Sequence, residues 1–363
     1  MKLTVTQENL SRALSTVSRV ASTRSSLPIL SNVLLKTEGN RLLVAATNLD
    51  IAVSETIGAK VAQEGSITVP ARLMQDFVSS LPSGTLELDV KDNKLQLSAE
   101  RFDSTINGVA AEEFPVMPTI DGGSVAEFSA GEMKQTLQQV LFAASSDDAR
   151  PVLTGVYMHA DKKKIFIAAT DSYRLAEKNI KKDAGDMSLL LPAQSLQELL
   201  RALKDDNESV TITYDDQQAR FRIASVEIVT RLIDGTYPDY RKLLPASFRT
   251  SAKLSKQSLN EITKVSSLFA REAAGSITLV IDEAKKEVSI SSIASQVGEN
   301  SAHAEAEVSG DAVITMNSRY ILDALQAFGG STIQINVNGK LDPCVLTDPD
   351  DDSYLHVIMP VKS

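Results

Sequence analysis

The amino-acid sequence contains one long pattern three times. Each copy reads as a strand, an amphipathic helix and a β-hairpin, in that order. The equivalent helix starts fall at Pro70, Pro192 and Asn317, which lie 122 and 125 residues apart. Solenoid repeats have periods of about 20 to 50 residues, so a unit of this length is a whole domain. A chain that holds three copies of one domain is built to form a symmetric object.

A second helix opens each copy, and a pair of strands follows it. Leu10, Met133 and Leu259 occupy equivalent places in these opening helices, 123 and 126 residues apart. The six helices are predicted over residues 7–20, 70–81, 131–144, 192–204, 256–271 and 317–328. We therefore expect an α+β fold in which each domain packs helices on antiparallel strands. The expected domain bounds are 1–121, 122–248 and 249–363.

The composition excludes several classes of protein. Hydrophobic residues make up 43% of the 363 residues and charged residues 23%, which is typical of a globular protein. Cys344 is the one cysteine, so no disulfide framework holds the chain together and a reducing cytosol suits it. The start of the chain lacks the apolar run of a signal peptide, and no stretch approaches 18 apolar residues. A cytoplasmic protein without a membrane span is expected.

Acidic and basic residues are unevenly distributed. The chain carries a net charge of −10, which argues against wrapping around a polyanion. The six predicted helices nevertheless sum to +4, which leaves −14 for the rest of the chain. If all six helices face one way, that surface could accept DNA while the opposite surface repels it. Ordinary variation in helix composition explains the same numbers, and the sequence does not decide between the two explanations.

No residue pattern indicates a catalytic site. His159, His303 and His356 lack the spacing of metal ligands, and Cys344 has no neighbouring histidine or helix start to activate it. Neither G-x-x-x-x-G-K-[ST] nor G-x-G-x-x-G occurs, so the sequence offers no nucleotide-binding loop. The acidic run at 348–353 lacks the glycine and the distal glutamate of an EF-hand loop. We expect a protein that is not an enzyme and that uses no cofactor and no metal.

Two segments combine aromatic, aliphatic and basic residues where strands end. They are AATDSYRLAEK at 168–178 and RLIDGTYPDYRKLLP at 231–245. Pro238 interrupts the strand pattern of the second segment, so Tyr237 and Tyr240 are expected to be partly exposed. Exposed aromatic and apolar side chains on a loop rim are typical of a peptide-binding patch. A cluster in which the loop packs on the strands predicts the same pattern, and both interpretations stay open.

Motifs along the whole chain resemble one known family, the bacterial DNA polymerase III beta subunits, or sliding clamps. They are MKLTV at 1–5, LPILSNVLL at 27–35, TVPAR at 68–72, ATDSYRLA at 169–176, IDGTYPDYRKLLP at 233–245 and VIMPV at 357–361. The resemblance implies three DNA-clamp domains and a head-to-tail homodimer that closes a six-domain ring lined by twelve helices. It implies a processivity factor that encircles double-stranded DNA of any sequence and tethers the replicative polymerase. The alternative is a peptide-binding repeat scaffold that does not encircle DNA.

The same resemblance implies a partner pocket between the second and third domains. In the family, the DNA polymerase III catalytic subunit, the clamp loader, other polymerases and repair proteins dock there through a short Gln- and Leu-rich motif. The matching positions are Leu153, Thr170, Ser172, Tyr173, Arg174, Leu175, Pro238, Lys242, Leu243, Leu341, Pro343, Val357, Met359, Pro360 and Val361. Some family members carry Gly-His where this chain has Ser172-Tyr173, and Arg in place of Lys242.

The resemblance also assigns DNA contacts. The matching positions are Arg24, Arg72 and Arg150. Aromatic residues often follow the position of Arg150 in the family, whereas Pro151 and Val152 follow it here.

Ring closure between two chains is implied at Ile106 in the first domain and at Leu268 and Phe269 in the third. On a lone chain, Leu268 and Phe269 at a helix end would join an exposed apolar patch, which usually marks an interface. The implied location is the bacterial cytoplasm, in association with the nucleoid.

Overall fold

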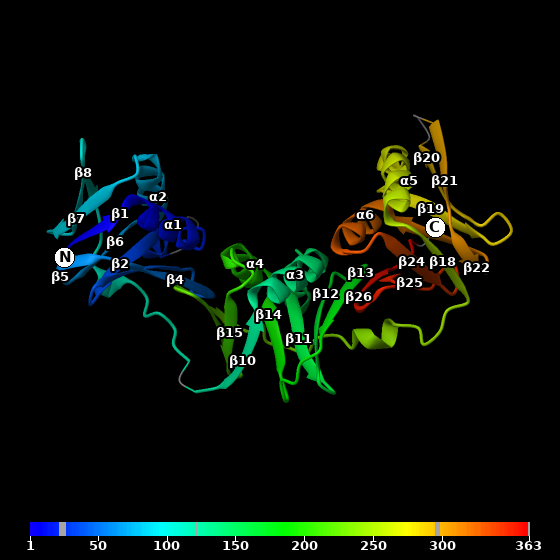
Figure 1. Ribbon diagram of the computed structural model, residues 1–363, viewed down its shortest axis with the longest axis horizontal. Helices are drawn as coiled ribbons and strands as arrows, with labels where there is room; N and C mark the ends of the chain where they lie inside the picture. Colours follow the sequence, from blue (N-terminus) through cyan, green and yellow to red (C-terminus); the bar gives the residue numbers. More distant parts are fainter. Residues whose placement is uncertain (22–26, 121, 295–297, 362–363) are drawn as a thin grey trace. The chain divides into compact units, whose positions relative to one another are not determined.

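The computed structural model describes residues 1–21, 27–120, 122–294 and 298–361 (Figure 1). The chain divides into two compact units. Unit 1 comprises Met1–Lys134 and Gln194–Leu232, and unit 2 comprises Gln135–Ala193 and Ile233–Ser363. The central third of the sequence therefore contributes to both units. Within the described residues, no helix is long and apolar enough to cross a membrane.

Six α-helices occur in the described residues, one at each predicted place. They are α1 (Gln7–Val17), α2 (Ala71–Ser80), α3 (Ala130–Val140), α4 (Ala193–Ala202), α5 (Lys256–Phe269) and α6 (Ser318–Ala327). Four of them begin after a polar residue whose side chain accepts a hydrogen bond from the first turn, namely Thr6, Ser129, Ser255 and Asn317. Such a cap satisfies a backbone N–H group that has no partner inside the helix.

The helices end earlier than predicted, and this changes the charge argument. Arg19, Lys204 and Arg271 lie beyond the ends of α1, α4 and α5. The six observed helices hold seven basic and six acidic residues, a net charge of +1. The predicted net charge of +4 is therefore too high for the helices themselves, because three of the cations lie in the segments that directly follow them.

Unit 1 contains two antiparallel sheets with the strand orders β10-β15-β16-β17-β4-β3-β2-β6 and β5-β1-β7-β8-β9 (Figure 1). The larger sheet consists of β10 (Ser124–Ser129), β15 (Ser209–Tyr214), β16 (Gln218–Ile223), β17 (Val226–Arg231), β4 (Ile51–Gly58), β3 (Arg41–Thr47), β2 (Asn32–Glu38) and β6 (Ser66–Pro70). The smaller consists of β5 (Lys60–Gln63), β1 (Lys2–Thr6), β7 (Thr85–Lys91), β8 (Lys94–Ala99) and β9 (Phe102–Asn107). α1 packs against α2 and covers β3 and β4. The 3₁₀-helices η1 (Pro28–Ser31) and η2 (Ala111–Glu113) flank the larger sheet.

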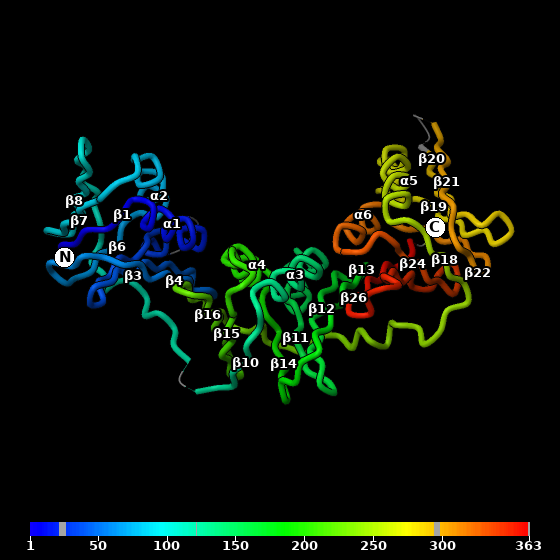
Figure 2. Tube along the Cα trace, in the orientation of Figure 1, coloured from blue at the N-terminus to red at the C-terminus, as the bar shows by residue number. Residues whose placement is uncertain are grey.

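Unit 2 also contains two antiparallel sheets, with the strand orders β14-β11-β12-β13-β26-β25-β24-β18-β22 and β21-β20-β19-β23. The larger sheet consists of β14 (Ser188–Pro192), β11 (Gly155–Asp161), β12 (Lys164–Thr170), β13 (Arg174–Ile180), β26 (Asp351–Ile358), β25 (Cys344–Asp348), β24 (Thr332–Val337), β18 (Thr250–Ser255) and β22 (Glu307–Ser309). The smaller consists of β21 (Gly298–Glu305), β20 (Glu287–Ala294), β19 (Ser276–Asp282) and β23 (Ala312–Asn317). Figure 2 shows α5 beside α6, and α5 also packs on β20 and β21. Short 3₁₀-helices are η3 (Leu141–Ala143), η4 (Pro151–Thr154), η5 (Tyr240–Leu243) and η6 (Arg271–Ala273).

Equivalent pairs of residues show the repeat in the strand register. The pairs Leu34–Ala45, Tyr157–Ala168 and Thr278–Ser291 lie at the same place in the three opening hairpins. The opening helices also agree, because Leu10, Met133 and Leu259 are all fully buried. The predicted helix and hairpin therefore open each copy.

Strand pairing joins different copies of the repeat, which the sequence did not predict. β17 of the second copy pairs with β4 of the first, so that Val229 lies opposite Ala52. β13 of the second copy pairs with β26 of the third, so that Leu175 lies opposite Val357. Each large sheet therefore runs through two copies of the repeat.

Candidate functional site

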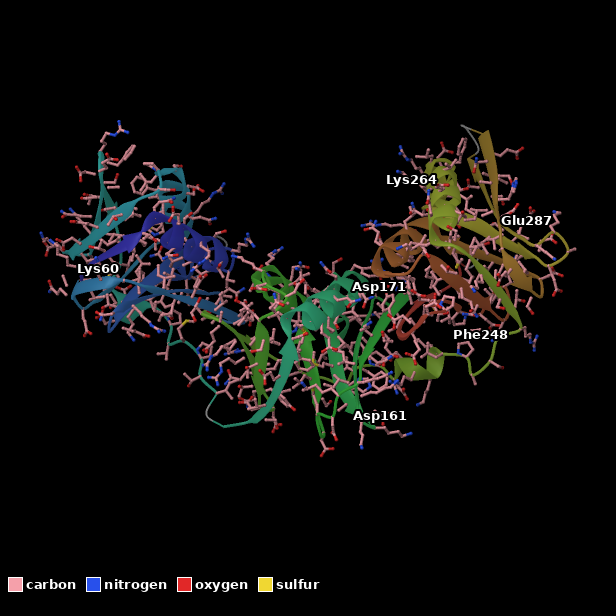
Figure 3. All side chains as sticks on the ribbon, in the orientation of Figure 1. Lys60, Asp161, Asp171, Phe248, Lys264 and Glu287 are labelled. Atoms are coloured by element: carbon pink, nitrogen blue, oxygen red, sulfur yellow. The ribbon has the colours of Figure 1, made fainter. Side chains whose placement is uncertain are left out.

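A tight turn between β12 and β13 forms the centre of the candidate site, and Asp171 in this turn is labelled in Figure 3. Asp171 Oδ1 accepts hydrogen bonds from the backbone N–H groups of Tyr173 and Arg174, both at 2.9 Å. Thr170 Oγ1 donates to Arg174 O at 2.6 Å and accepts from Ser172 N at 3.1 Å. Ser172 takes the left-handed conformation, with a φ of 77°. Two polar side chains thus hold the backbone of the turn in place.

Arg174 ties this turn to α6 and to η3. Its guanidinium donates to Asp171 Oδ2 at 3.1 Å, to Asp323 Oδ2 at 2.6 Å and to the carbonyl oxygen of Phe142 at 2.6 Å. It also lies over the rings of Phe142 and Tyr320, 5.3 and 4.8 Å from their centroids. Only 10% of the side chain is exposed. Arg174 is therefore part of the frame of the site, with most of its donors used inside the protein.

The fifteen residues that the resemblance assigns to the pocket all lie in unit 2, and their exposure separates a floor from a rim. The buried floor consists of Leu153, Thr170, Leu175 and Val357. The half-buried members are Arg174, Pro343, Met359 and Pro360. The exposed rim consists of Ser172, Tyr173, Pro238, Lys242, Leu243, Leu341 and Val361. An apolar floor with an exposed and largely apolar rim is suited to an extended peptide.

The segment that follows β26 connects the turn to the small sheet of unit 2. Met359 N donates to Tyr173 O at 2.8 Å, and Val361 N donates to Thr315 O in β23 at 2.8 Å. Tyr173 is 63% exposed, which is high for an aromatic side chain. The backbone of the half-buried Met359 is therefore hydrogen-bonded to that of the exposed Tyr173, and the segment is held to the turn on one side and to β23 on the other.

The segment 237–244 carries Pro238, Lys242 and Leu243 of the predicted pocket, and here a prediction was wrong. Tyr237 and Tyr240 are buried, not partly exposed. Tyr237 stacks on Tyr157 with ring centroids 5.1 Å apart, and both buried tyrosines join the hydrophobic cluster that contains the floor of the pocket. Pro238 is exposed and lies outside any strand, but leaving the sheet does not expose the flanking rings. The packing-cluster interpretation is therefore correct for these two side chains.

A buried carboxylate holds the same wall against the sheet. Glu177 Oε2 accepts a hydrogen bond from Tyr240 OH at 2.5 Å and lies 3.5 Å from Arg241 Nε. The Arg241 guanidinium also covers the ring of Phe166, 3.7 Å from its centroid. Burial and the Glu177 carboxylate raise the pKa of Tyr240, so the phenol keeps its proton and donates it to Glu177. These contacts fix η5, which carries Lys242 and Leu243 of the rim.

A hollow of about 420 Å³ opens beside the turn. It is lined by Ala144, Ser145, Ser146, Asp147, Arg150, Leu153, Asp171, Tyr173, Arg174, Arg319 and Tyr320. Leu153, Tyr173 and Arg174 also belong to the predicted pocket, so the hollow and the pocket share walls. Sequence reasoning missed Arg319 and Tyr320, because the pattern at 317–328 indicated an amphipathic helix and gave no signal of what its first turn would face.

Two of the three residues assigned to DNA contact lie in the described part of the chain, and Arg24 lies outside it. Arg72 is on α2, with 88% of its side chain exposed and its Nε 3.9 Å from Asp76. Arg150 precedes η4, and its Nη1 donates to Ser172 Oγ at 3.0 Å. Arg150 therefore touches the turn at the centre of the candidate site.

Of the residues assigned to ring closure, Ile106 lies in an edge strand of one small sheet, and Leu268 and Phe269 lie on a helix that packs against an edge strand of the other. Ile106 is buried in β9, which is an edge strand in unit 1. Leu268 on α5 is 54% exposed, and Phe269 ends the same helix half-buried. α5 lies on β21, which is an edge strand in unit 2. Among the described strands, β9 and β21 each pair on one side only.

Two buried titratable groups lie in the strands under the pocket. Burial and, to a smaller extent, Arg174 lower the pKa of His356 to about 3. Burial raises the pKa of the Cys344 thiol to about 12. Both side chains are therefore neutral at pH 7. In the part of the chain that the structure describes, no three His, Cys, Asp or Glu side chains gather so that they could hold a metal ion.

Comparison with known proteins matches the whole length of the chain to one family. Family models of the DNA polymerase III beta subunit match in order: its N-terminal domain at residues 1–118, its central domain at 127–239 and its C-terminal domain at 241–362. The prediction of three clamp domains is thereby confirmed.

Relatives and solved structures agree with the family models. A beta sliding clamp of Synechocystis sp. is 30% identical over 388 residues, which cover all of this chain and 99% of the relative. The crystal structure of the DNA polymerase sliding clamp from Bacillus subtilis is 27% identical, with a TM-score of 0.96 over 100% of this chain and 99% of that one. A DnaN sliding clamp from Pseudomonas aeruginosa, bound to griselimycin, is 25% identical, with a TM-score of 0.95 over 100% of both chains. The chain therefore belongs to the beta sliding clamps, the beta subunits of bacterial DNA polymerase III.

Proposed function

We propose that this protein is a sliding clamp, a ring of two chains that encircles double-stranded DNA and tethers DNA polymerase III to it. The match of the entire chain to three clamp domains is the observation that carries the proposal. Two chains supply six domains and twelve α-helices, because the described part of one chain contains six α-helices. The protein acts by keeping its partners on DNA and catalyses no reaction itself.

The ring closes where the first domain of one chain contacts the third domain of the other. Ile106 of one chain meets Leu268 and Phe269 of the other, where the exposed Leu268 offers apolar surface to bury. The edge strands β9 and β21 support this assignment, because an edge strand is a template for pairing with another chain.

Phe269→Asp places a charge in that interface, and we expect it to open or monomerise the ring. Molar mass in solution, by light scattering, measures the effect. Val125→Asp is the matched control, because Val125 is an exposed apolar residue of β10 that is not assigned to the interface. A dimer mass that stays unchanged in the Phe269 variant would contradict the assignment.

DNA is held without tight binding. Arg24, Arg72 and Arg150 are the proposed phosphate contacts, and Arg19 and Lys204 add cations just beyond α1 and α4. Each neutralised phosphate adds affinity and salt dependence, so few contacts keep the ring mobile along the duplex. Contacts to phosphates carry no sequence information, which suits a ring that must pass over any sequence.

Partner proteins dock in the pocket of unit 2. The DNA polymerase III catalytic subunit, the clamp loader, other polymerases and repair proteins would each present a short Gln- and Leu-rich segment. Its apolar side chains bury against Leu153, Leu175 and Val357, and the flexible Met359 adapts to different partners. Tyr173 and Leu243 close over the segment from the exposed rim.

Retention on DNA of different topology tests the proposal. After loading by a clamp loader, the protein should stay on nicked circular DNA and leave when a restriction enzyme linearises it. Blocking both ends with bound protein should restore retention. A scaffold that binds peptides without encircling DNA would show equal retention on circular and linear DNA, and this outcome would contradict the proposal.

We also propose that the three domains comprise residues 1–121, 122–248 and 249–363. The proposed location is the bacterial cytoplasm, in association with the nucleoid. Fluorescent tagging in cells, with foci that follow the replication forks, tests the location. Uniform fluorescence during replication would argue against it.

A further inference from the structure

We propose that the hollow beside the turn selects partner peptides that carry an acidic residue next to the apolar motif, and that Arg150 and Arg319 bind its carboxylate. The inference rests on the proposed function of the neighbouring pocket. It adds a polar determinant to a site whose floor is apolar.

The hollow is placed to receive a residue that flanks the motif. Its volume of about 420 Å³ exceeds what one side chain needs, and Leu153, Tyr173 and Arg174 line both the hollow and the predicted pocket. A peptide that buries its leucines on the floor therefore passes along the wall of the hollow. Residues just before or after the leucines are the ones that can reach into it.

Arg150 forms no ion pair with any residue that the structure describes, so its positive charge is available. Its side chain contacts Ser172 through one hydrogen bond, from Nη1 to Oγ at 3.0 Å. The acceptor is a neutral hydroxyl, so the charge is left for another partner. A guanidinium has five N–H donors, and this bond uses one of them.

Arg319 offers the second charge from the first turn of α6. Its side chain is 82% exposed, and its Nε lies 3.9 Å from Asp323 Oδ2. That same oxygen accepts the 2.6 Å hydrogen bond from Arg174. Asp323 is therefore committed to Arg174, and its hold on Arg319 is weak. The first turn of a helix adds a positive potential at this place.

The acidic residues of the hollow leave room for a carboxylate. Asp171 is occupied by Arg174 and by the backbone of the turn. Asp147 Oδ1 accepts from Ala149 N at 3.0 Å, which turns the carboxylate toward its own loop. Apart from the Arg174–Asp171 pair, the charged residues that line the hollow are Arg150, Arg319 and Asp147. Planar guanidinium groups match a carboxylate in geometry as well as in charge.

Fluorescence anisotropy with matched peptides tests the inference on the full-length protein. The probe is a labelled Gln-Leu-Ser-Leu-Phe peptide with blocked ends, extended by one Glu at either end. Gln-extended peptides of the same length are the controls. We expect one of the Glu peptides to bind about two- to fivefold more tightly than its Gln twin, and the difference to shrink as salt rises.

Variants locate the effect. The double substitution Arg150→Gln with Arg319→Gln should abolish the preference for Glu, so that the Glu- and Gln-extended peptides bind the variant with equal affinity. Arg319→Glu should reverse the preference. Lys163→Gln is the matched control, because Lys163 is an exposed cation of unit 2 that does not line the hollow. It should leave the preference intact, which separates local binding from the general charge of the protein.

The outcomes separate this inference from the proposed function. If the peptides bind and neither Glu peptide gains over its twin, the selection of acidic residues is overturned while the pocket stands. If Lys163→Gln weakens the preference as much as the arginine variants do, the local assignment is overturned. If no peptide binds to the folded dimer, the pocket assignment fails and this inference fails with it.

Discussion

The turns at 47–51 in unit 1 and 170–174 in unit 2 have the same hydrogen bonds and different side chains. In each turn the second residue, Asn48 or Asp171, accepts hydrogen bonds from two backbone N–H groups through Oδ1. In each, the preceding threonine donates to the carbonyl of the last residue and accepts from a third N–H group. The repeat therefore fixes the backbone of the turn in both units.

The returning strand repeats the same contact. Arg231 N donates to Asp50 O at 3.0 Å in unit 1, and Met359 N donates to Tyr173 O at 2.8 Å in unit 2. The frame of the candidate site is therefore present twice, once in each unit. A frame of this kind is a property of the fold, and it does not by itself make a binding site.

The side chains on that frame separate the two copies. Ala52 and Arg231 stand in unit 1 where unit 2 has Leu175 and Met359, so only unit 2 has large apolar side chains at both places. The last residue of the turn is Ile51 in unit 1 and the half-buried Arg174 in unit 2. The same backbone frame therefore carries large apolar side chains in unit 2 and not in unit 1, at two positions of the predicted pocket.

The largest expected effect comes from Arg174. Arg174→Met leaves the carboxylates of Asp171 and Asp323 without their shared partner, and we expect it to lower the free energy of unfolding by about 2–3 kcal/mol. Ile51→Met exchanges one apolar side chain for another at the equivalent place and should cost less than about 1 kcal/mol. Urea denaturation of both variants measures the difference. Equal losses would show that Arg174 does not hold the frame.

The pH dependence of stability should differ between the two units by an amount of similar size. His356 has a folded pKa of about 3, below its ordinary value, whereas Ile228 occupies the equivalent place in unit 1. The unfolded state then binds more protons than the folded state between about pH 6.5 and pH 3, so stability is complete above this range and falls as the pH drops. We expect His356 to contribute a loss of about 2 kcal/mol between pH 7 and pH 5.

His356→Leu removes this titration and provides the measurement. Its free energy of unfolding should fall less between pH 7 and pH 5 than that of the unmodified protein, whatever the substitution costs at pH 7. Hydrogen exchange at pH 5 should show β26 of unit 2 opening more readily than β17 of unit 1. An identical pH dependence in the variant and the parent would mean that the buried imidazole does not titrate as its burial implies.

The features predicted correctly from the sequence are those with a local pattern. Helical periodicity and the alternation of strands located all six helices and the opening hairpins, because each depends on residues a few positions apart. Helix ends were less well predicted. The residues around Arg19 and Lys204 have the composition of a helix, but α1 and α4 end before them. The predicted net charge of the helices, +4 instead of +1, was wrong because it depended on residues in the turn after each helix end.

Features built from distant residues gave no usable signal. The pairing of β13 with β26 joins strands that are far apart in the sequence, and Arg174 meets Asp323 across 149 positions. The burial of Tyr237 and Tyr240 was missed for a related reason. Pro238 shows only that the backbone leaves the sheet, whereas the path of the rings depends on the strands beneath them.

A moderate effect on peptide binding is expected when a residue of the predicted pocket in unit 2 is replaced by the residue at the equivalent place in unit 1. Met359→Arg copies Arg231 of unit 1 and puts a charge beside the apolar floor. We expect it to weaken binding of the Gln-Leu-Ser-Leu-Phe peptide more than about tenfold, which corresponds to about 1.4 kcal/mol. Anisotropy measures the loss. Arg231→Met is the matched control and should create no second site, because Ala52 leaves that copy shallow. Two peptides bound per chain of the control would show that one methionine suffices to make the pocket.

The smallest expected effect concerns the third residue of each turn, which is Leu49 in unit 1 and Ser172 in unit 2. Both take the left-handed conformation, with φ of 81° and 77°. This conformation costs a residue with a Cβ roughly 1–2 kcal/mol, and glycine regains part of that while adding entropy to the unfolded chain. Leu49→Gly should therefore raise the free energy of unfolding by about 0.5 kcal/mol. Ser172→Gly should gain less, because it also removes the hydrogen bond to Arg150.

Denaturation midpoints of the two glycine variants decide what Leu49 does. Leu49 is 47% exposed, so about half of the residue is covered by the rest of the protein. If Leu49→Gly stabilises unit 1, the leucine has little role in packing and the strained position is an inherited feature of the repeat. If it destabilises unit 1 by more than about 1 kcal/mol, the buried half of the side chain contributes more than the strain costs. The third residue of the turn would then have a different role in each unit. Leu49 would contribute to packing in unit 1, and Ser172 would accept the hydrogen bond from Arg150 in unit 2.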